Sequence, residues 1–140
     1  MLQQWTVALV ALVAATGVAR AEGDLGVRGT RMELVIGTGE SGFGVSQKNF
    51  ELTTGKLYQL KIKATGAKEC AWEAPQLAAT VWLRKVEAGN VEIKAPTLTE
   101  LEFERESEAE IFFVPIRTGN FPWRCRGMEA QGMAGAFLIK

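Results

Sequence analysis

Residues 115–140 read PIRTGNFPWRCRGMEAQGMAGAFLIK, and the interpretation of the whole chain starts from this stretch. Two short β-rich pieces, 121–123 and 136–139, enclose a loop that carries Cys125, Met128 and Met133. The chain contains 2 cysteines and 4 methionines but no histidine. A metal site built on this loop must therefore use sulfur where imidazole is absent, because thiolates and thioethers are the soft ligands that remain.

The hydrophobic pattern upstream of the loop has the period of strands, with apolar and polar side chains alternating in 58–62. Strand-like pieces lie at 58–62, 81–86, 91–93, 99–103, 111–114, 121–123 and 136–139, and Met32 lies in an earlier one. Glycine-containing turns separate these pieces at intervals of roughly 8 to 12 residues. The spacing predicts an all-β domain, an antiparallel β-sandwich of seven to eight strands or a closely related barrel.

The glutamate-rich segment 98–110 also has a helical alternative. The step from Leu98 to Leu101 fits one side of a helix, but positions 104, 105 and 108, where that side would continue, are all charged. The two-residue spacing of the apolar side chains within 99–103 favours a strand, with an outward face of solvated glutamates.

The N-terminal segment predicts export. Residues 6–18 form an apolar run of signal-peptide length, and Ala19-Arg20-Ala21 gives a small-x-small cleavage pattern. We therefore expect a signal peptide at 1–21 and one domain at 22–140, which is 140 − 21 = 119 residues, in the periplasm. The alternative is an uncleaved membrane anchor, although the run is shorter than the ~20 residues of a spanning helix. We expect no stable membrane span after cleavage.

The segments around the two cysteines resemble those of cupredoxins, small blue-copper proteins such as plastocyanin and pseudoazurin. In the C-terminal loop, Cys125 and Met133 have the expected type and spacing, and Met128 stands where a histidine is expected. Upstream, LYQLKIKATGAKECAWE resembles the strand and turn that carry the first histidine ligand, with Cys70 at that position and Trp72 at the aromatic one. The resemblance implies a cupredoxin-like Greek-key β-sandwich and metal ligands at Cys70, Cys125, Met128 and Met133.

A second resemblance concerns the middle of the chain. The segment LRKVEAGNVEIKAP, followed by the strand IFFVP, resembles periplasmic cupredoxin-like proteins found with bacterial ferrous-iron transport systems. Members of that group often lack the complete blue-copper ligand set. The resemblance implies electron transfer or metal handling in periplasmic iron uptake, with a membrane transport protein or a redox protein as partner.

The chemistry of the sulfur set leaves two hypotheses open. An all-sulfur pocket selects Cu(I), because soft donors favour this ion over ions that prefer oxygen or nitrogen, so copper is the expected metal. Two cysteines in an exported domain equally predict a disulfide, and the family positions of Cys70 and Cys125 bring them within bridging range. A permanent Cys70–Cys125 disulfide would leave a metal-free scaffold that docks to a partner. A pair that opens and closes would make the disulfide and the copper-bound form alternative states of one site.

Charged residues near the sulfurs suggest a further alternative. Glu69, Glu73 and Glu129 offer hard oxygen ligands for iron, as a component of a ferrous-iron oxidase would require. The same carboxylates can instead be solvated or pair with the arginines that flank the loop, Arg117, Arg124 and Arg126. Without histidine, Cys-His and Ser-His catalysis are excluded, which leaves ferrous-iron oxidation as the enzymatic possibility. The balance of 16 basic and 16 acidic residues does not favour a nucleic-acid partner.

Overall fold

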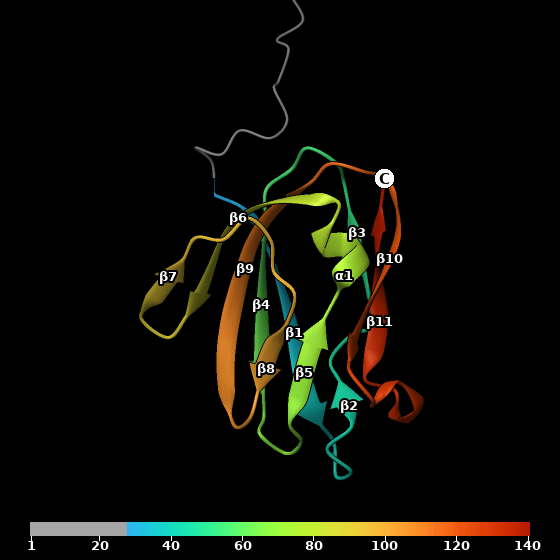
Figure 1. Cartoon of the computed structure of the whole chain (residues 1–140). Coiled ribbons are helices and arrows are strands. Elements are labelled where there is room, and N and C mark those ends of the chain that lie inside the picture. Colours follow the sequence, from blue (N-terminus) through green and yellow to red (C-terminus); the bar gives the residue numbers. More distant parts are fainter. Residues whose placement is uncertain (1–27) are drawn as a thin grey trace, which may run out of the picture.

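The structure, a computed structural model, describes residues 28–140 (Figure 1). The predicted signal peptide and its cleavage site lie outside the described residues. Strands dominate the described part of the chain and form two sheets, which confirms the expected all-β sandwich (Figure 1).

The first sheet has six strands in the order β2-β1-β4-β9-β6-β7. Its strands are β1 (Thr30–Thr38), β2 (Gly44–Val45), β4 (Tyr58–Ala64), β6 (Val81–Ala88), β7 (Val91–Ile93) and β9 (Ser107–Pro115). The second sheet has five strands in the order β3-β11-β10-β5-β8. Its strands are β3 (Asn49–Leu52), β5 (Cys70–Glu73), β8 (Leu101–Phe103), β10 (Gly119–Cys125) and β11 (Ala134–Ile139).

Helices are short in residues 28–140. They are the α-helix α1 (Pro75–Ala78) and the 3₁₀-helix η1 (Glu129–Gln131). Within this part of the chain, no helix has the length and apolar character that crossing a membrane requires.

Every strand-like piece of the sequence coincides with a strand, and the glutamate-rich segment contains β8 rather than a helix. The hydrophobic pattern did not predict β2, β3 and β5, which have two to four residues each. Strands of this length show too little alternation to be recognised.

Two strand pairs run parallel, which differs from a purely antiparallel sandwich. Strand β1 pairs with β4, with Thr30 opposite Tyr58, and β11 pairs with β3, with Phe137 opposite Phe50. The chain crosses to the other sheet for β3 and returns for β4, and this crossover allows β4 to run in the direction of β1. All the other described pairs are antiparallel.

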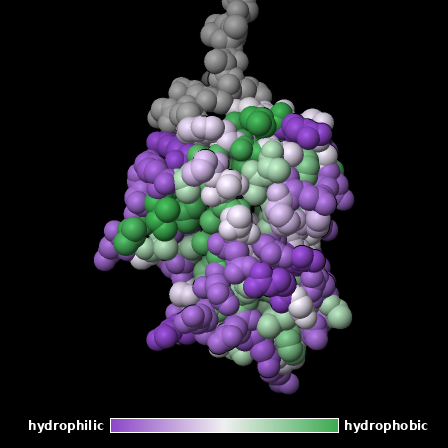
Figure 2. All heavy atoms as spheres, viewed as in Figure 1, coloured by the Kyte–Doolittle hydropathy of each residue, from purple (hydrophilic) through white to green (hydrophobic). Residues whose placement is uncertain are grey.

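The core lies between the sheets and follows the alternation of the sequence. Buried and half-buried residues alternate along the whole of β4, and Leu60 and Ile62 have no exposed surface. Phe137 of the second sheet stacks on Phe50 at 5.1 Å between ring centroids and meets the edge of Phe113 at 6.5 Å. Figure 2 shows a largely hydrophilic surface on one face, with hydrophobic side chains gathered near the β6–β7 hairpin.

Candidate functional site

Two short strands of the second sheet position the cysteines. Strand β5 pairs with β10 so that Trp72 lies opposite Cys125, and it pairs with β8 so that Cys70 lies opposite Phe103. The burial of both strands alternates, and Cys70, Trp72, Trp123 and Cys125 are on the buried face. Alternation on adjacent strands therefore directs both cysteine side chains into the core at neighbouring places.

Cys70 and Cys125 form a disulfide. Their Cα atoms are 5.0 Å apart, which lies within the range that a disulfide spans. The exposed fractions are 1% for Cys70 and 0% for Cys125, so neither sulfur is open to solvent. Of the two hypotheses for this pair, the structure shows the disulfide.

The loop after β10 folds back on Cys125 and brings Met133 beside it. The Cys125 amide donates to the Met133 carbonyl at 2.9 Å, and the Met128 amide donates to the Cys125 carbonyl at 3.0 Å. Helix η1 fills the return and is followed by Gly132, whose φ of 97° lies in the left-handed region that glycine adopts without strain. Met133 is fully buried, whereas Met128 is only partly buried and packs against the edge of the core.

The structure therefore brings together three of the four predicted ligand residues in one buried region: Cys70, Cys125 and Met133. Met128 lies at its border. Met32, which the sequence placed in the core, packs against the same core cluster from β1. Trp123 is a core residue whose Nε1 donates to the Lys48 carbonyl at 3.0 Å.

A network of ion pairs covers the outer side of this region. Arg124 contacts Glu73 at 2.6 Å and Glu129 at 3.0 Å. Arg126 contacts Glu100, and also Glu73 at 3.8 Å. Glu73 raises the pKa of Arg124, with a smaller contribution from Glu129. The pKa of Glu129 is lowered, first by backbone amide donation and then by Arg124.

These ion pairs disfavour the binding of iron by Glu69, Glu73 and Glu129, the carboxylates that the sequence suggested as its ligands. Glu73 and Glu129 are engaged with arginines, and Glu69 is exposed on the surface. Within residues 28–140, no group of three or more histidine, cysteine, aspartate or glutamate side chains is arranged to hold a metal ion. The sequence did not identify Glu100 as a member of the network, since its position suggested a solvated acidic face.

Comparison with solved structures identifies the architecture. A multicopper oxidase from Pseudomonas thermotolerans superposes with a TM-score of 0.60 at 13% identity, over 86% of this chain and 31% of that chain. A multicopper oxidase from Campylobacter jejuni superposes with a TM-score of 0.56 at 12% identity, over 79% of this chain and 30% of its own. A copper nitrite reductase from Nitrosomonas europaea gives 0.57 at 10% identity, over 81% and 49%.

The chain has a cupredoxin-like fold. It spans less than half the length of each of these three proteins, and the identities are low enough that the likeness concerns the fold. No family model and no curated protein sequence matches the chain.

The cupredoxin-like fold allows a test of whether these residues fit copper. In the disulfide state, each cysteine sulfur is bonded to the other, so neither is a thiolate that could bind a metal ion. The oxidised site therefore does not fit a copper ion. After reduction, the same core cluster would contain two thiols and the Met133 thioether, which are all soft donors.

Proposed function

We propose that this protein is an exported cupredoxin-like copper-handling protein whose Cys70–Cys125 disulfide opens to hold Cu(I) as cargo. In the open state Cys70, Cys125 and Met133 bind the ion, and Met128 joins them from the border of the site. The observation that carries this proposal is the burial of the two cysteines and Met133 in one region, at positions where the cupredoxin resemblance places metal ligands.

Opening the site requires a reductant. The S–S bond accepts two electrons and two protons from a protein dithiol, which becomes a disulfide in turn, and Cys70 and Cys125 become thiols. The thiols lose their protons when Cu(I) binds, because the thiolate is the form that binds a metal. Removal of the ion and loss of two electrons to an oxidant of the disulfide class restore the bond.

The ligand set favours metal handling over electron transfer. A site that cycles rapidly must accommodate Cu(II) as well as Cu(I), and this chain has no imidazole for Cu(II). A periplasmic role in an iron-uptake system, with a membrane transport protein as partner, rests on the second sequence resemblance. Ferrous-iron oxidation is the weaker option, since two of the three nearby glutamates already contact arginines.

A second candidate function follows from the burial of the disulfide. With exposed fractions of 1% and 0%, the sulfurs are out of reach of solvent-borne thiols while the loop is closed. A disulfide that never opens would make the protein a stapled, metal-free cupredoxin-like scaffold that acts by docking to a partner.

Titration with Cu(I) separates these functions. The protein is fully reduced, its free thiols are counted, and Cu(I) is delivered from a competing chelator. Copper handling requires one ion per chain after reduction and none before it. Met133→Leu should weaken binding at least about tenfold, since it replaces a soft donor by an apolar side chain of similar size.

Met32→Leu is the matched control, because Met32 is a half-buried methionine in the other sheet and should leave the affinity unchanged. If the reduced and folded protein does not take Cu(I) from the chelator, copper handling is wrong and the scaffold function stands.

A further inference from the structure

The edge of the six-stranded sheet at β7 carries apolar side chains that the second sheet does not cover. Ile93 lies opposite Val86, a core residue, and Val91 lies opposite Ala88, which packs against the core. Opposite residues of adjacent strands share one face of the sheet, so Val91 and Ile93 continue its core-facing side. Figure 1 shows β7 at the left, apart from the second sheet, and Figure 2 shows hydrophobic side chains there.

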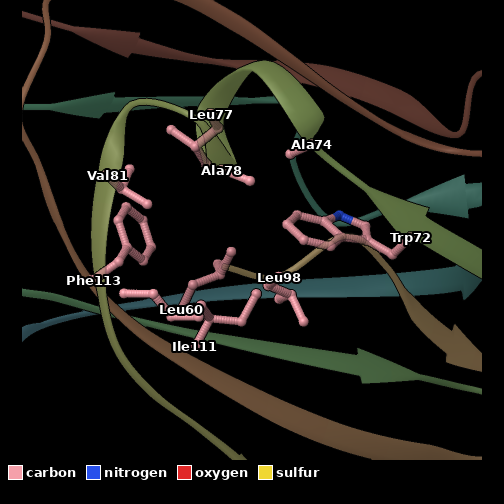
Figure 3. A pocket seen from close by; sticks show the side chains of 10 residues that line it. Leu60, Trp72, Ala74, Leu77, Ala78, Val81, Leu98, Ile111 and Phe113 are labelled. Carbon is pink, nitrogen blue, oxygen red and sulfur yellow. The ribbon is translucent and has the colours of Figure 1, made fainter. Parts of the chain in front are cut away.

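The core-facing side of the neighbouring strand β6 is better covered. Figure 3 shows Val81, at the start of β6, beside Leu77 and Ala78 of α1. Val91 and Ile93 instead keep exposed fractions of 60% and 42%. The described part of the chain therefore leaves the apolar side of β7 largely open.

The backbone at this edge is open as well, since no described strand pairs with the outer side of β7. The β6–β7 loop, 89–90, has two residues, and the residues that flank such a loop face each other as a hydrogen-bonded pair. The direction of the backbone groups alternates along a strand. The N–H and C=O groups of Val91 and Ile93 therefore point to β6, and those of Glu92 and Lys94 point outward.

The charges at this edge are self-complementary. Glu92 and Lys94 lie on the same face of the sheet and contact each other at 2.7 Å. If β7 pairs antiparallel with the β7 of a second copy, centred on Ile93, each Glu92 lies opposite the Lys94 of the other copy. These two residues are the ones whose backbone groups point outward, so they can form the hydrogen-bonded pairs of the ladder. The two Ile93 residues then form a non-hydrogen-bonded pair, in which side chains approach most closely.

The edge of the second sheet at β8 has no such complementarity. Glu100, Glu102 and Glu104 alternate along β8 and its flanking residues. Antiparallel pairing of two β8 strands with their core-facing sides aligned would place glutamate opposite glutamate, and like charges in that position are destabilising. Of these two edges, β7 is the one whose charges favour pairing with itself.

We propose that two copies of this chain associate through β7, in antiparallel pairing about a two-fold axis at Ile93. The six-stranded sheets of the two copies then form one continuous sheet, and the same surface serves both partners. Glu92 and Lys94 form ion pairs between the copies on the outer face, and Ile93 meets its counterpart on the core-facing side. Pro96 has no N–H with which to extend the pairing, so the contact is short and the dimer is reversible.

This contact is independent of the proposed copper function. Strand β7 lies at the edge of the first sheet, whereas Cys70 and Cys125 lie on strands of the second. Association of the oxidised protein is therefore measured without any change at the disulfide, and the two proposals fail separately.

Two charge reversals test the proposed register. Glu92→Lys leaves two lysines at the edge and Lys94→Glu leaves two glutamates, so each variant alone places like charges opposite one another in the dimer. In a mixture of the two variants, every lysine of one chain faces a glutamate of the other. Glu102→Lys is the control, because it makes the same change in net charge as Glu92→Lys but lies on β8, in the other sheet.

Sedimentation equilibrium of the oxidised proteins measures association, at concentrations up to about 1 mM and in low salt, where charge pairs are screened least. We expect a reversible monomer–dimer equilibrium for the native protein and for Glu102→Lys. Self-association of each single β7 variant should be at least about tenfold weaker. The equimolar mixture should recover an affinity close to that of the native protein.

The mixture also separates the contact from the stability of the hairpin. Glu92 contacts Lys85 and Lys94 within one chain, so a reversal also alters the hairpin itself. That alteration is the same whether a variant is alone or mixed, and recovery in the mixture therefore reports pairing between chains. Hydrogen exchange of the Glu92 and Lys94 amides should slow as the dimer forms.

Three results would overturn the proposal. A native protein that stays monomeric throughout leaves the edge open to a different protein. A dimer that neither reversal weakens is held through another surface. A mixture that associates as poorly as the single variants shows that Glu92 and Lys94 do not face each other across a two-fold axis.

Discussion

Reduction of the Cys70–Cys125 disulfide should lower the free energy of unfolding by about 4 kcal/mol. The two residues are separated by 55 positions. On the chain-entropy relation, a disulfide that closes a loop of that length lowers the entropy of the unfolded chain by about 14 cal/mol/K. This entropy loss corresponds to about 4 kcal/mol at 25 °C. A small domain is typically stable by only 5–15 kcal/mol, so reduction removes a large part of the total.

Urea denaturation followed by circular dichroism measures this difference on the oxidised and reduced protein. The double substitution Cys70→Ala and Cys125→Ala is the control, since its unfolding curve should not respond to reductant. Addition of Cu(I) to the reduced wild-type protein should recover part of the loss, because a ligand that binds only the folded state stabilises it by mass action. The reasoning is refuted if the oxidised and reduced proteins unfold within about 1 kcal/mol of each other, since the chain-entropy term would then be absent.

Three further predictions concern the fold. Phe137→Ala should cost about 3–5 kcal/mol in urea denaturation, because the ring has no exposed surface and contacts two other core rings. Gly135→Ala should cost about 3 kcal/mol or more and expose β3 amides to hydrogen exchange, because the added Cβ would overlap the Lys48 carbonyl oxygen. Hydrogen bonds from Lys94 and Lys85 lower the pKa of Glu92 to about 2. The ionised Glu92 side chain therefore stabilises the β6–β7 hairpin at pH 4.5 and above. That contribution should disappear as the pH falls through about 2, and an NMR titration of the Glu92 side chain together with β7 amide exchange would show whether it does.

The sequence was most informative where side chains alternate over several residues. The alternation of Tyr58, Leu60 and Ile62 predicts β4, because burial on one face requires that period. The parallel pairing of β11 with β3 could not be predicted in this way. Alternation specifies which face of a strand is buried, but it does not specify which distant strand lies beside it.

For the candidate site, the sequence predicted which two cysteines lie together, but it did not predict whether they form a disulfide or bind a metal ion. The placement of Cys70 and Cys125 as neighbours came from the cupredoxin resemblance, and the structure confirms that they are joined. A disulfide and a pair of thiolates that bind one metal ion can be formed by nearly the same backbone arrangement. Residue spacing therefore does not distinguish the two.

Helix α1 could not be predicted from the hydrophobic pattern. A helix of four residues shows no helical period, and Pro75 at its first turn was the available indication.

The position of β11 has a consequence for how the chain folds. The C-terminal strand lies between β3 and β10, and its Phe137 pairs with Phe50, which is 137 − 50 = 87 residues earlier. A ribosome releases the chain from its N-terminus, so β3 remains without its only described neighbour until β11 has been made. Closing so long a loop is slow, and the second sheet cannot be completed by any shorter nascent chain. A chain that stops before β11 leaves the backbone of β3 and the ring of Phe50 without the partners that β11 supplies.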